Sequence, residues 1–297
     1  MYINTILTKI QYGTIKKMIK YMVIGDPVSH SRSPGMQNAA FEACGLGSPY
    51  GRRHVTPDEL PEFVEFARKE LAGVNLTVPH KAAVIPLIDR VDPEAAAAGS
   101  VNTLVIENGE IFGTSTDGYG LEHALLANFH RPVRGAAFCF AGAGGAAHAT
   151  AFHLAGCGAR AIRLANRTLA KAEELAERLR RRNPELLVET ARIDDVEQLA
   201  RWFADTDFLI QATSLGLRPA DPPPFPLELL HGEMNLCIFD TIYRETPLLE
   251  QARKLALPCA GGMDMLIYQG AKSFEIWTGR PAPVEVMRRG FLEAVPC

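Results

Sequence analysis

The sequence predicts an α/β protein with two domains. Its length of 297 residues is about twice that of a typical domain. From residue 21 onward, segments of β character alternate with helical ones, which is typical of parallel strands with helices on both faces. A glycine-rich turn also stands between a buried strand and a helix near the middle of the chain.

Composition and charge exclude several other classes. Apolar residues make up 47% of the chain and charged residues 22%, close to the globular average, which rules out a disordered tail, a collagen and a coiled coil. No apolar run approaches the roughly 18 residues of a membrane span. The net charge of −3 argues against a broad surface for nucleic acid or membrane.

The first half contains clear start signals for helices and one hairpin signal. Ser33 is a candidate N-cap with Pro34 at the first helical position, and Thr56 with Glu59 forms a capping box. Asn108-Gly109 is typical of a two-residue hairpin turn. The expected strands are 21–25, 73–78, 101–107 and 110–114, and the expected helices are 33–44, 56–71, 79–88, 93–98 and 117–128.

The sequence pattern changes after residue 134, where the second half of the chain begins. Residues 136–141 form a continuous apolar run, as expected of a strand buried on both faces. The proline-rich stretch 219–226 is expected to be a loop, because proline cannot donate in a strand ladder. The further expected strands are 161–165, 208–212 and 236–243, and the expected helices are 142–154 (after its glycine turn), 168–181, 246–257, 263–277 and 284–292.

Cysteine and histidine spacing argues against metal sites and disulfides. The six cysteines form no C-x-x-C pair, which favours reduced thiols in a cytoplasmic protein. The histidines show neither H-E-x-x-H nor H-x3-H spacing, so no metal is expected, and His148 and His153 are assigned packing or surface roles. The basic run 178–182 is expected to be a solvated helix end. Residues 1–20 lack the features of a signal peptide and are expected to be a disordered extension or an over-long start.

The strongest physical signal is the segment Gly142-Ala143-Gly144-Gly145-Ala146-Ala147. It fits G-x-G-x-x-G/A between a predicted strand and a predicted helix, which is the context that a dinucleotide site requires. The glycines let the backbone approach a pyrophosphate, and the helix N-terminus supplies N–H donors. A tight turn without a ligand is the alternative.

The end of the next strand indicates which dinucleotide binds. An NAD site needs a carboxylate there for the ribose 2′-hydroxyl. This chain has Asn166-Arg167-Thr168, and Arg167 with Lys171 can instead hold a 2′-phosphate. The sequence therefore favours NADP, the alternative being a plain N-cap at Thr168 beside a solvated Arg167.

Three polar clusters in the first half follow predicted strands. Ser31 and Ser33 flank a helix start and suit a small carboxylate, although capping alone would explain them. Lys81 lies in the first turn of a helix, where its charge opposes the helix dipole. Asp117 is a good N-cap by itself, but together with Lys81 it could handle the proton that accompanies a hydride.

Several motifs follow one another over nearly the whole chain, from about residue 21 to residue 289. They are Gly25-Asp26-Pro27, His30-Ser31-Arg32-Ser33-Pro34, Gly73 to Lys81, Gly99-Ser100-Val101-Asn102-Thr103, Thr116-Asp117-Gly118, the glycine turn, Asn166-Arg167-Thr168, Asp240 with Tyr243, Thr246-Pro247-Leu248-Leu249, and Met265-Leu266 with Gln269. In this order they strongly resemble the shikimate dehydrogenase family. The resemblance implies reversible, NADP-linked reduction of 3-dehydroshikimate to shikimate, on the route to chorismate and the aromatic amino acids.

The resemblance also implies an architecture and a set of partners. It predicts two α/β domains with a cleft between them: a substrate-binding domain formed by residues 21–122 and 260–297, and a Rossmann-like NADP-binding domain formed by residues 123–259. The C-terminal helices then return to the first domain. The expected partners are small molecules, without nucleic acid, membrane or metal, in a monomer or homodimer.

Roles for single residues follow from the same resemblance. It implies that Lys81 and Asp117 are the catalytic pair, and that Ser31 and Ser33 hold the substrate carboxylate. It assigns the substrate ring and its hydroxyls to Thr77, Asn102, Asp117, Tyr243 and Gln269. It assigns the cofactor to Gly142, Ala143, Gly144, Gly145, Ala146, Asn166, Arg167, Thr168, Lys171, Thr241 and Gly262.

The chain departs from the family pattern at four places. Ser115 and Gln211 stand where the family has asparagine, Asp264 replaces a glycine, and the segment 243–247 is two residues shorter than usual. We expect these departures near the nicotinamide and the cleft. They leave two alternatives open: a dehydrogenase of quinate or an aminated analogue, and an NADP(H)-binding sensor without turnover.

Overall fold

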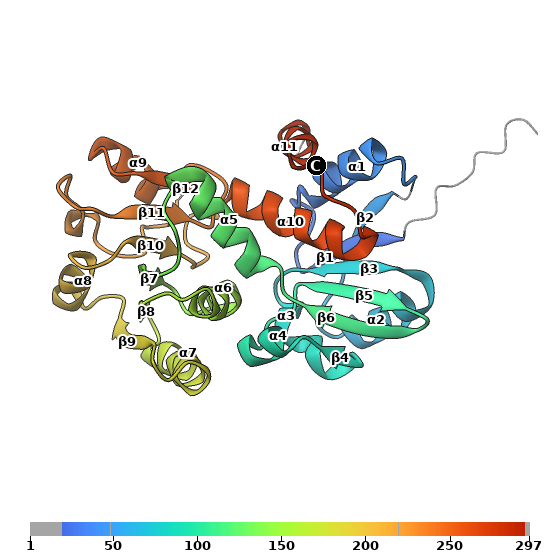
Figure 1. Ribbon diagram of the computed structural model, residues 1–297, viewed down its shortest axis with the longest axis horizontal. Coiled ribbons are helices and arrows are strands. Elements are labelled where there is room, and N and C mark those ends of the chain that lie inside the picture. Colours follow the sequence, from blue (N-terminus) through green and yellow to red (C-terminus); the bar gives the residue numbers. More distant parts are fainter. Residues whose placement is uncertain (1–19, 48, 219, 295–297) are drawn as a thin grey trace, which may run out of the picture.

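Two six-stranded sheets organise the molecule. The computed structural model describes residues 20–47, 49–218 and 220–294. The strand orders are β2-β1-β3-β5-β6-β4 and β12-β11-β10-β7-β8-β9. Figure 1 shows two lobes side by side, and we call the one with the first sheet the substrate lobe and the other the nucleotide lobe.

The sheet of the substrate lobe is mixed. β1 pairs in parallel with β2 and β3, whereas β5 is antiparallel to both β3 and β6. The predicted hairpin is present, and Asn108 and Gly109 both have positive φ, as a tight two-residue turn requires. The strands are β1 Tyr21–Gly25, β2 Tyr50–His54, β3 Gly73–Leu76, β4 Arg90–Val91, β5 Thr103–Glu107 and β6 Glu110–Thr114.

Helices from both ends of the chain cover this sheet. The C-terminal helices α10 and α11 pack against α1 around Met36, Phe41 and Phe274, so the chain returns to the first lobe as the resemblance implies. Trp277 of α10 donates its indole N–H to the Leu104 carbonyl at 2.9 Å. The helices of this lobe are α1 Ser33–Ala43, α2 Leu60–Glu70, α3 His80–Ala83, the 3₁₀ turn Ile85–Leu87, α4 Pro93–Ala98, α10 Met263–Thr278 and α11 Val284–Glu293.

The sheet of the nucleotide lobe is entirely parallel. Its central strand β7 is buried along its whole length, and Phe138 and Cys139 on its two faces belong to different hydrophobic clusters. Both faces are covered by helices, which explains the continuous apolar run. The elements are β7 Ala137–Ala141, α6 Gly145–Gly156, β8 Ala161–Asn166, α7 Leu169–Arg182, β9 Leu187–Arg192, α8 Val196–Phe203, β10 Phe208–Gln211, the 3₁₀ turn Leu227–Leu229, β11 Cys237–Asp240, α9 Pro247–Lys254 and β12 Cys259–Gly261.

Several predicted elements need correction. The predicted strand 236–243 ends at Asp240, where an aspartate carboxylate turns the chain by accepting from the Ile242 N–H. The predicted helix 79–88 is two short pieces. Strands β2 and β9, helix α8 and strand β12 were not expected, because their sequences are short or carry many charged side chains that give no clear period.

Two helices begin at positions that differ from those predicted from their N-terminal sequence signals. Ser33 is the first helical residue rather than the N-cap, and Arg32 at the cap position makes no side-chain capping bond. Thr56 and Glu59 do bond each other, with Glu59 Oε2 accepting from the Thr56 N–H at 2.8 Å, but α2 begins only at Leu60. A turn separates the box from the helix.

One long helix links the lobes. α5, Asp117–Phe129, begins beside the first sheet and packs against α10 and α6 (Figure 1). The predicted domain boundary at residue 122 falls inside it, so that boundary stays a prediction. Arg178 of α7 donates to the Ala97 carbonyl of α4 at 2.6 Å, which corrects the expectation that the whole basic run is solvated.

Two further expectations concern the chain as a whole. The predicted extension 1–20 lies, apart from Lys20, outside the described residues. Among the residues that are described, no helix has the length and hydropathy needed to cross a bilayer.

Candidate active site

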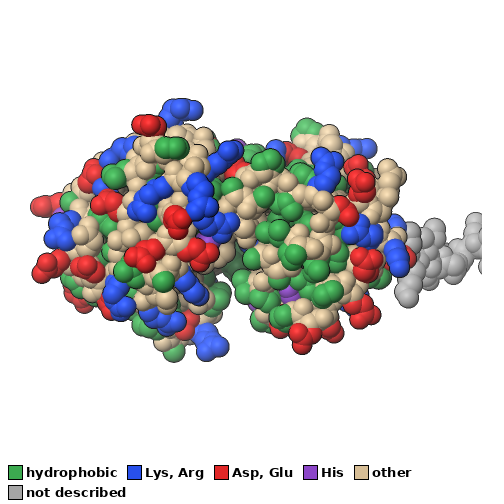
Figure 2. Space-filling view, turned by 90° about the horizontal axis from the view of Figure 1, so that it is seen from below, with side chains coloured by type: hydrophobic (Ala, Val, Ile, Leu, Met, Phe, Trp, Pro, Cys, Tyr) green, Lys and Arg blue, Asp and Glu red, His purple; other side chains and the backbone are tan. Residues whose placement is uncertain are grey.

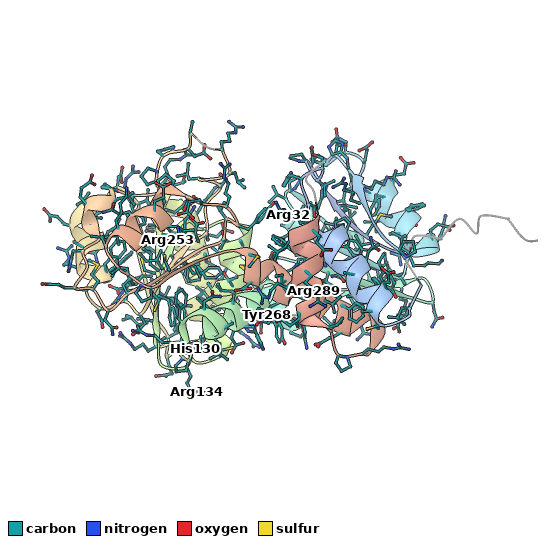
Figure 3. All side chains as sticks on the ribbon, turned by 90° about the horizontal axis from the view of Figure 1, so that it is seen from above. Arg32, His130, Arg134, Arg253, Tyr268 and Arg289 are labelled. Atoms are coloured by element: carbon teal, nitrogen blue, oxygen red, sulfur yellow. The ribbon has the colours of Figure 1, made fainter. Side chains whose placement is uncertain are left out.

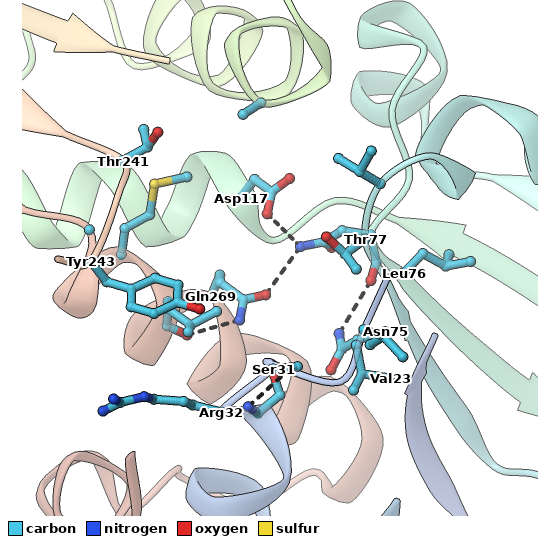
Figure 4. Close-up of a pocket in the computed structure, with 18 of the residues that line it drawn as sticks. Val23, Ser31, Arg32, Asn75, Leu76, Thr77, Asp117, Thr241, Tyr243 and Gln269 are labelled. Atoms are coloured by element: carbon cyan, nitrogen blue, oxygen red, sulfur yellow. Dashed lines mark hydrogen bonds between the residues drawn. The ribbon is translucent and has the colours of Figure 1, made fainter. Parts of the chain in front are cut away.

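A cavity of about 300 Å³ lies between the lobes. The ends of β1, β3 and β11 and the first turns of α5, α6 and α10 contribute its walls. Figure 2 shows a furrow separating the two lobes on one face, and Figure 4 shows side chains from both lobes facing one another across the cavity. Strand ends and helix starts meet here because both sheets present their polar edges to the same gap.

Lys81 and Asp117 form an ion pair in the wall of this cavity. Lys81 Nζ donates to Asp117 Oδ2 at 2.5 Å, and the two side chains are 18% and 7% exposed. The other carboxylate oxygen accepts from Asn102 Nδ2 at 2.8 Å. Helix α5 has no side-chain capping bond, so the simple N-cap interpretation of Asp117 does not hold. Its carboxylate orients the ammonium instead.

A buried amide–hydroxyl network fixes Asn102 behind this pair. Its Oδ1 accepts from the Thr116 N–H at 2.9 Å, and its Nδ2 also lies 3.2 Å from Gln269 Oε1. Asn75 extends the network by donating to Ser273 Oγ at 3.0 Å. Since every member lies in or near the core, the network holds the amide groups in one arrangement. Asn75 is a polar member that the sequence analysis did not assign.

The predicted carboxylate ligands lie at the start of α1. Ser31 Oγ accepts from the Ser33 N–H at 3.3 Å, and both serines line the cavity with Thr77. Thr77 is placed there by β3 and the turn that follows it. The two hydroxyls at the positive end of the α1 dipole form an anion-binding arrangement. The N–H groups of the first turn do not add to it, because Pro34 has none and Gly35 donates to the Arg32 carbonyl.

Arg32 and Tyr243 close the cavity on the side of the nucleotide lobe. The Arg32 guanidinium lies over the Phe291 ring at 5.0 Å, and the Tyr243 ring meets Phe291 edge-on. Figure 3 shows Arg32 on the side of its lobe that borders the gap. Burial raises the pKa of the Tyr243 hydroxyl, so this group stays protonated and can donate. Sequence reasoning had quoted Arg32 only as part of a motif.

The glycine turn borders a second cavity of about 420 Å³. Gly142 has φ of +110°, and a Cβ there would come within 2.8 Å of Thr213, so only glycine fits. In front of Gly144 and Gly145 the space is open. The predicted cofactor residues Gly142, Ala143, Gly144, Gly145, Ala146, Asn166, Arg167, Thr168, Lys171 and Thr241 all line this cavity.

The two cavities adjoin. Val78, Ala146 and Thr241 line both of them, and Gly262 lines the first. A Cβ on Gly262 would overlap the Thr241 carbonyl, so this glycine permits a close backbone contact where the cavities meet. A ligand in the second cavity can therefore reach the ion pair in the first.

No acidic side chain is among the residues that line the second cavity within the described chain. Arg167 and Lys171 follow β8 and lie exposed at its rim, and Asn166 Oδ1 accepts from the Ala143 N–H at 3.3 Å. Thr168 stands at the N-cap of α7 without a side-chain capping bond. The residues present fit a dinucleotide with an extra phosphate, because two cations face it and no carboxylate opposes it.

Three of the four departures from the family pattern lie behind the cavities, whereas the fourth, the short segment 243–247, begins at Tyr243, which lines the first cavity. Gln211 Oε1 accepts from the Thr213 N–H at 2.7 Å and shapes the loop after β10. Asp264 accepts from Asn128 at 2.8 Å and pairs with Arg288, joining α10 to α5 and α11. The Ser115 hydroxyl is buried. Neither cavity is lined by any of these three residues.

Asp240 is a further buried acid beside the site. It accepts from the Ile242 N–H at 2.9 Å and from Thr246 Oγ1 at 2.8 Å. Burial raises its pKa to about 6 and outweighs these two hydrogen bonds, which lower it. The carboxylate thus positions the segment that contains Thr241 and Tyr243, a role that sequence spacing did not reveal.

Residues missed by sequence reasoning share a position in the topology. Thr213, Ser214 and Leu217 line the second cavity and belong to the loop after β10. β10 pairs directly with β7, and ligands of parallel sheets bind beyond the carboxyl ends of such central strands. Because strand 208–212 was predicted, the loop that follows it could have been assigned to the cofactor site from the sequence.

Comparisons with known proteins agree with this arrangement. The family profiles described as shikimate dehydrogenase substrate binding domain, shikimate / quinate 5-dehydrogenase, and shikimate 5′-dehydrogenase C-terminal domain match residues 23–104, 125–216 and 262–289. A shikimate dehydrogenase (NADP(+)) of Methanopyrus kandleri is 42% identical over 277 residues, which is 91% of this chain and 94% of that protein.

Solved structures give the same result. Shikimate 5-dehydrogenase from Thermus thermophilus, in complex with NADP(H) and shikimate, superposes with a TM-score of 0.82 at 33% identity over 94% of this chain and 100% of that chain. Quinate dehydrogenase from Corynebacterium glutamicum, in complex with NAD, gives 0.80 at 28% identity over 93% and 99%. Sequence, fold and site geometry agree: this chain belongs to the shikimate dehydrogenase family.

Proposed function

We propose that this protein is an NADP-dependent oxidoreductase that reversibly reduces 3-dehydroshikimate to shikimate, a step towards chorismate and the aromatic amino acids. The observation that carries the proposal is the Lys81–Asp117 pair in a cavity that adjoins the glycine-turn cavity. A carbonyl bound beside Lys81 then lies within reach of a hydride donor bound in the second cavity.

In this mechanism Lys81 acts as the proton donor. NADPH, when bound, supplies the hydride that converts the ring carbonyl to an alcohol. The Lys81 ammonium stabilises the negative charge that develops on the carbonyl oxygen and gives that oxygen a proton. Asp117 holds the ammonium in place at 2.5 Å, and Asn102 holds Asp117. In the reverse direction a neutral Lys81 takes the hydroxyl proton, so the pair acts as one coupled unit.

The remaining cavity residues bind the substrate. Ser31 and Ser33 donate to its carboxylate, with support from the N-terminus of α1. Thr77, Asn102, Tyr243 and Gln269 bind the ring hydroxyls. A cavity of about 300 Å³ suits a single six-membered ring with small substituents.

The cofactor residues follow the second cavity. The turn Gly142 to Ala146 binds the pyrophosphate, and the group Asn166, Arg167, Thr168 and Lys171 binds the adenosine with its 2′-phosphate. Thr241 and Gly262 lie by the nicotinamide, where the cavities meet. Arg167 and Lys171 make NADP the preferred dinucleotide, because an NAD site places a carboxylate there.

A crossed assay tests this proposal. Purified protein is given shikimate or quinate with NADP or NAD, and the absorbance of the reduced nicotinamide is followed. Rapid reduction with shikimate and NADP alone is the expected result. Turnover of quinate with NAD would instead indicate a quinate dehydrogenase, like the Corynebacterium enzyme whose structure contains NAD. Tight NADPH binding without turnover would replace it with a sensor.

Location and assembly complete the proposal. We place the protein in the cytoplasm, because the cysteines among the described residues are free thiols, as a reducing compartment keeps them. The site is complete within one chain, so a monomer suffices for activity, and a homodimer is equally compatible with it.

A further inference from the structure

Four side chains outside the proposed active site converge where three helices meet. Glu94 lies on α4 of the substrate lobe, Glu122 on the connecting helix α5, His153 on α6 of the nucleotide lobe, and Cys157 at the C-cap that follows α6. α6 packs against both other helices (Figure 1). The mechanism proposed above uses none of these groups.

The histidine ring is held from two sides. Its Nε2 lies 2.8 Å from Glu122 Oε2, and its Nδ1 lies 3.2 Å from Glu94 Oε1. The side chain is only 21% exposed. Gly118 on α5 permits this approach, because a Cβ there would overlap His153.

The ligand set is one that zinc prefers. His153 lies in the last turn of α6 and Cys157 is the C-cap four residues on, with helical φ and ψ, so both side chains lie on the same side of the helix end. The candidate ligand atoms of Glu122, His153 and Cys157 all lie within 4.8 Å of one another. Bonds of about 2.0–2.3 Å in a tetrahedral site place ligand atoms roughly 3.5 Å apart, so small side-chain rotations close the gap.

Glu94 supplies the outer contact that metal-bound histidines need. A histidine that coordinates through Nε2 commonly donates its Nδ1–H to a carboxylate, which sets the tautomer and the ring orientation. Glu94 already lies at Nδ1, while Nε2 faces Glu122. The search for H-x3-H spacing missed this group because the partner of the histidine on α6 is a cysteine.

We propose that Glu122, His153 and Cys157 bind one Zn²⁺ ion at the junction of the two lobes, with Glu94 orienting His153 and a water completing the site. The ion links α5 to α6 through its ligands, and the contact of Glu94 with His153 extends this link to α4. Glu122 lies on the same helix as Asp117, so the metal site also holds the helix that carries the proposed catalytic carboxylate. This role is structural and is independent of the proposed reaction.

The competing interpretation is a plain ionic contact. Burial disfavours a charged His153, but hydrogen bonds with Cys157, Glu94 and Glu122 outweigh that effect and raise its pKa to about 10. A protonated imidazole can therefore bridge the two glutamates with no metal. Zinc would have to displace the imidazole proton and the thiol proton.

Metal titration of the full-length protein decides between these interpretations. Chelator-treated protein is titrated with Zn²⁺ against a chromogenic chelator, and with Co²⁺ while the visible and near-ultraviolet spectrum is recorded. We expect one equivalent of each metal, a tetrahedral Co²⁺ spectrum with a thiolate charge-transfer band, and a higher unfolding temperature with zinc. Cys157→Ser should lose the band and most of the affinity.

Matched variants keep the test decisive. Cys259→Ser and His231→Asn alter a cysteine and a histidine elsewhere and should bind metal like the parent protein. Glu122→Gln, which keeps the size of the side chain, should also lose the tightly bound metal ion. This variant provides the test if Cys157→Ser fails to fold. The proposal is wrong if the parent protein takes up no tight equivalent, or if Cys157→Ser and Glu122→Gln both bind Zn²⁺ as tightly as the two controls.

Discussion

The two cavities are built by different means. The first is lined by buried side chains, among them Asn102, Asp117 and Gln269, whose positions are set by hydrogen bonds across three elements. The second is a backbone surface with open space before two glycines and exposed cations at its rim. A preorganised site performs chemistry, whereas a backbone cradle with a charged rim selects and holds a long anionic ligand.

The largest effect should come from the ion pair. Lys81→Ala removes the proposed proton donor and should lower kcat by about 10²- to 10⁴-fold. NADPH affinity should stay unchanged, because Lys81 lines the first cavity only. Single-turnover kinetics and fluorescence titration of NADPH measure the two quantities. A collapse of cofactor affinity would mean that the cavities are not separate in function.

The next effect concerns the buried acid beside the site. The pKa of Asp240 is raised to about 6 in the folded protein from an ordinary 3.8, so the folded state binds the proton more tightly than the unfolded state. Its carboxylate therefore lowers stability as pH rises from about 4 to about 7, by on the order of 3 kcal/mol.

Asp240→Asn isolates this contribution. The free energy of unfolding of the parent protein minus that of the variant should fall across this pH range. Denaturant titrations at about pH 4.5, about pH 6 and about pH 7, all within the window, measure the difference. A flat difference would mean that Asp240 keeps an ordinary pKa.

Substitutions at the rim of the second cavity should change the cofactor preference and leave kcat unchanged, which is the opposite of the effects expected for Lys81→Ala. Arg167→Ala removes the proposed charge-assisted bond to the 2′-phosphate, so the preference for NADP over NAD should fall by roughly 10- to 100-fold through KM. The kcat at saturating NADP should hold. Lys171→Ala should act in the same direction, and Arg201→Ala, on the exposed face of α8, serves as a control with no effect. An equal fall in kcat with both dinucleotides would contradict the division between the cavities.

The smallest effect is expected at a departure from the family pattern. Asp264→Ala breaks the pair with Arg288 and the bond from Asn128, and should lower the free energy of unfolding by about 1 kcal/mol. The ratio of kcat/KM for shikimate to that for quinate should not change, because Asp264 lines neither cavity. A shift in that ratio would show that residues behind the cavity set specificity.

Local sequence was enough where neighbouring residues decide the structure. The hairpin at Asn108-Gly109, the buried strand β7 and the glycine turn all follow from backbone preference or continuous apolar character, and each was confirmed. Strands β2 and β9 were missed because their outer faces are charged, so pairing within the sheet rather than pattern creates them.

The sequence by itself determined the fold class, the glycine turn and the basic side chains after β8, because each depends on residues adjacent in the chain. The tertiary structure decided how Asp117 is used. Its position at a helix start allowed a cap or an ion pair, and Lys81, 36 residues away, settled the choice by filling the same buried space. Likewise only the packing of α4, α5 and α6 brings Glu94, Glu122 and His153 together, since spacing along one helix cannot predict contacts between helices.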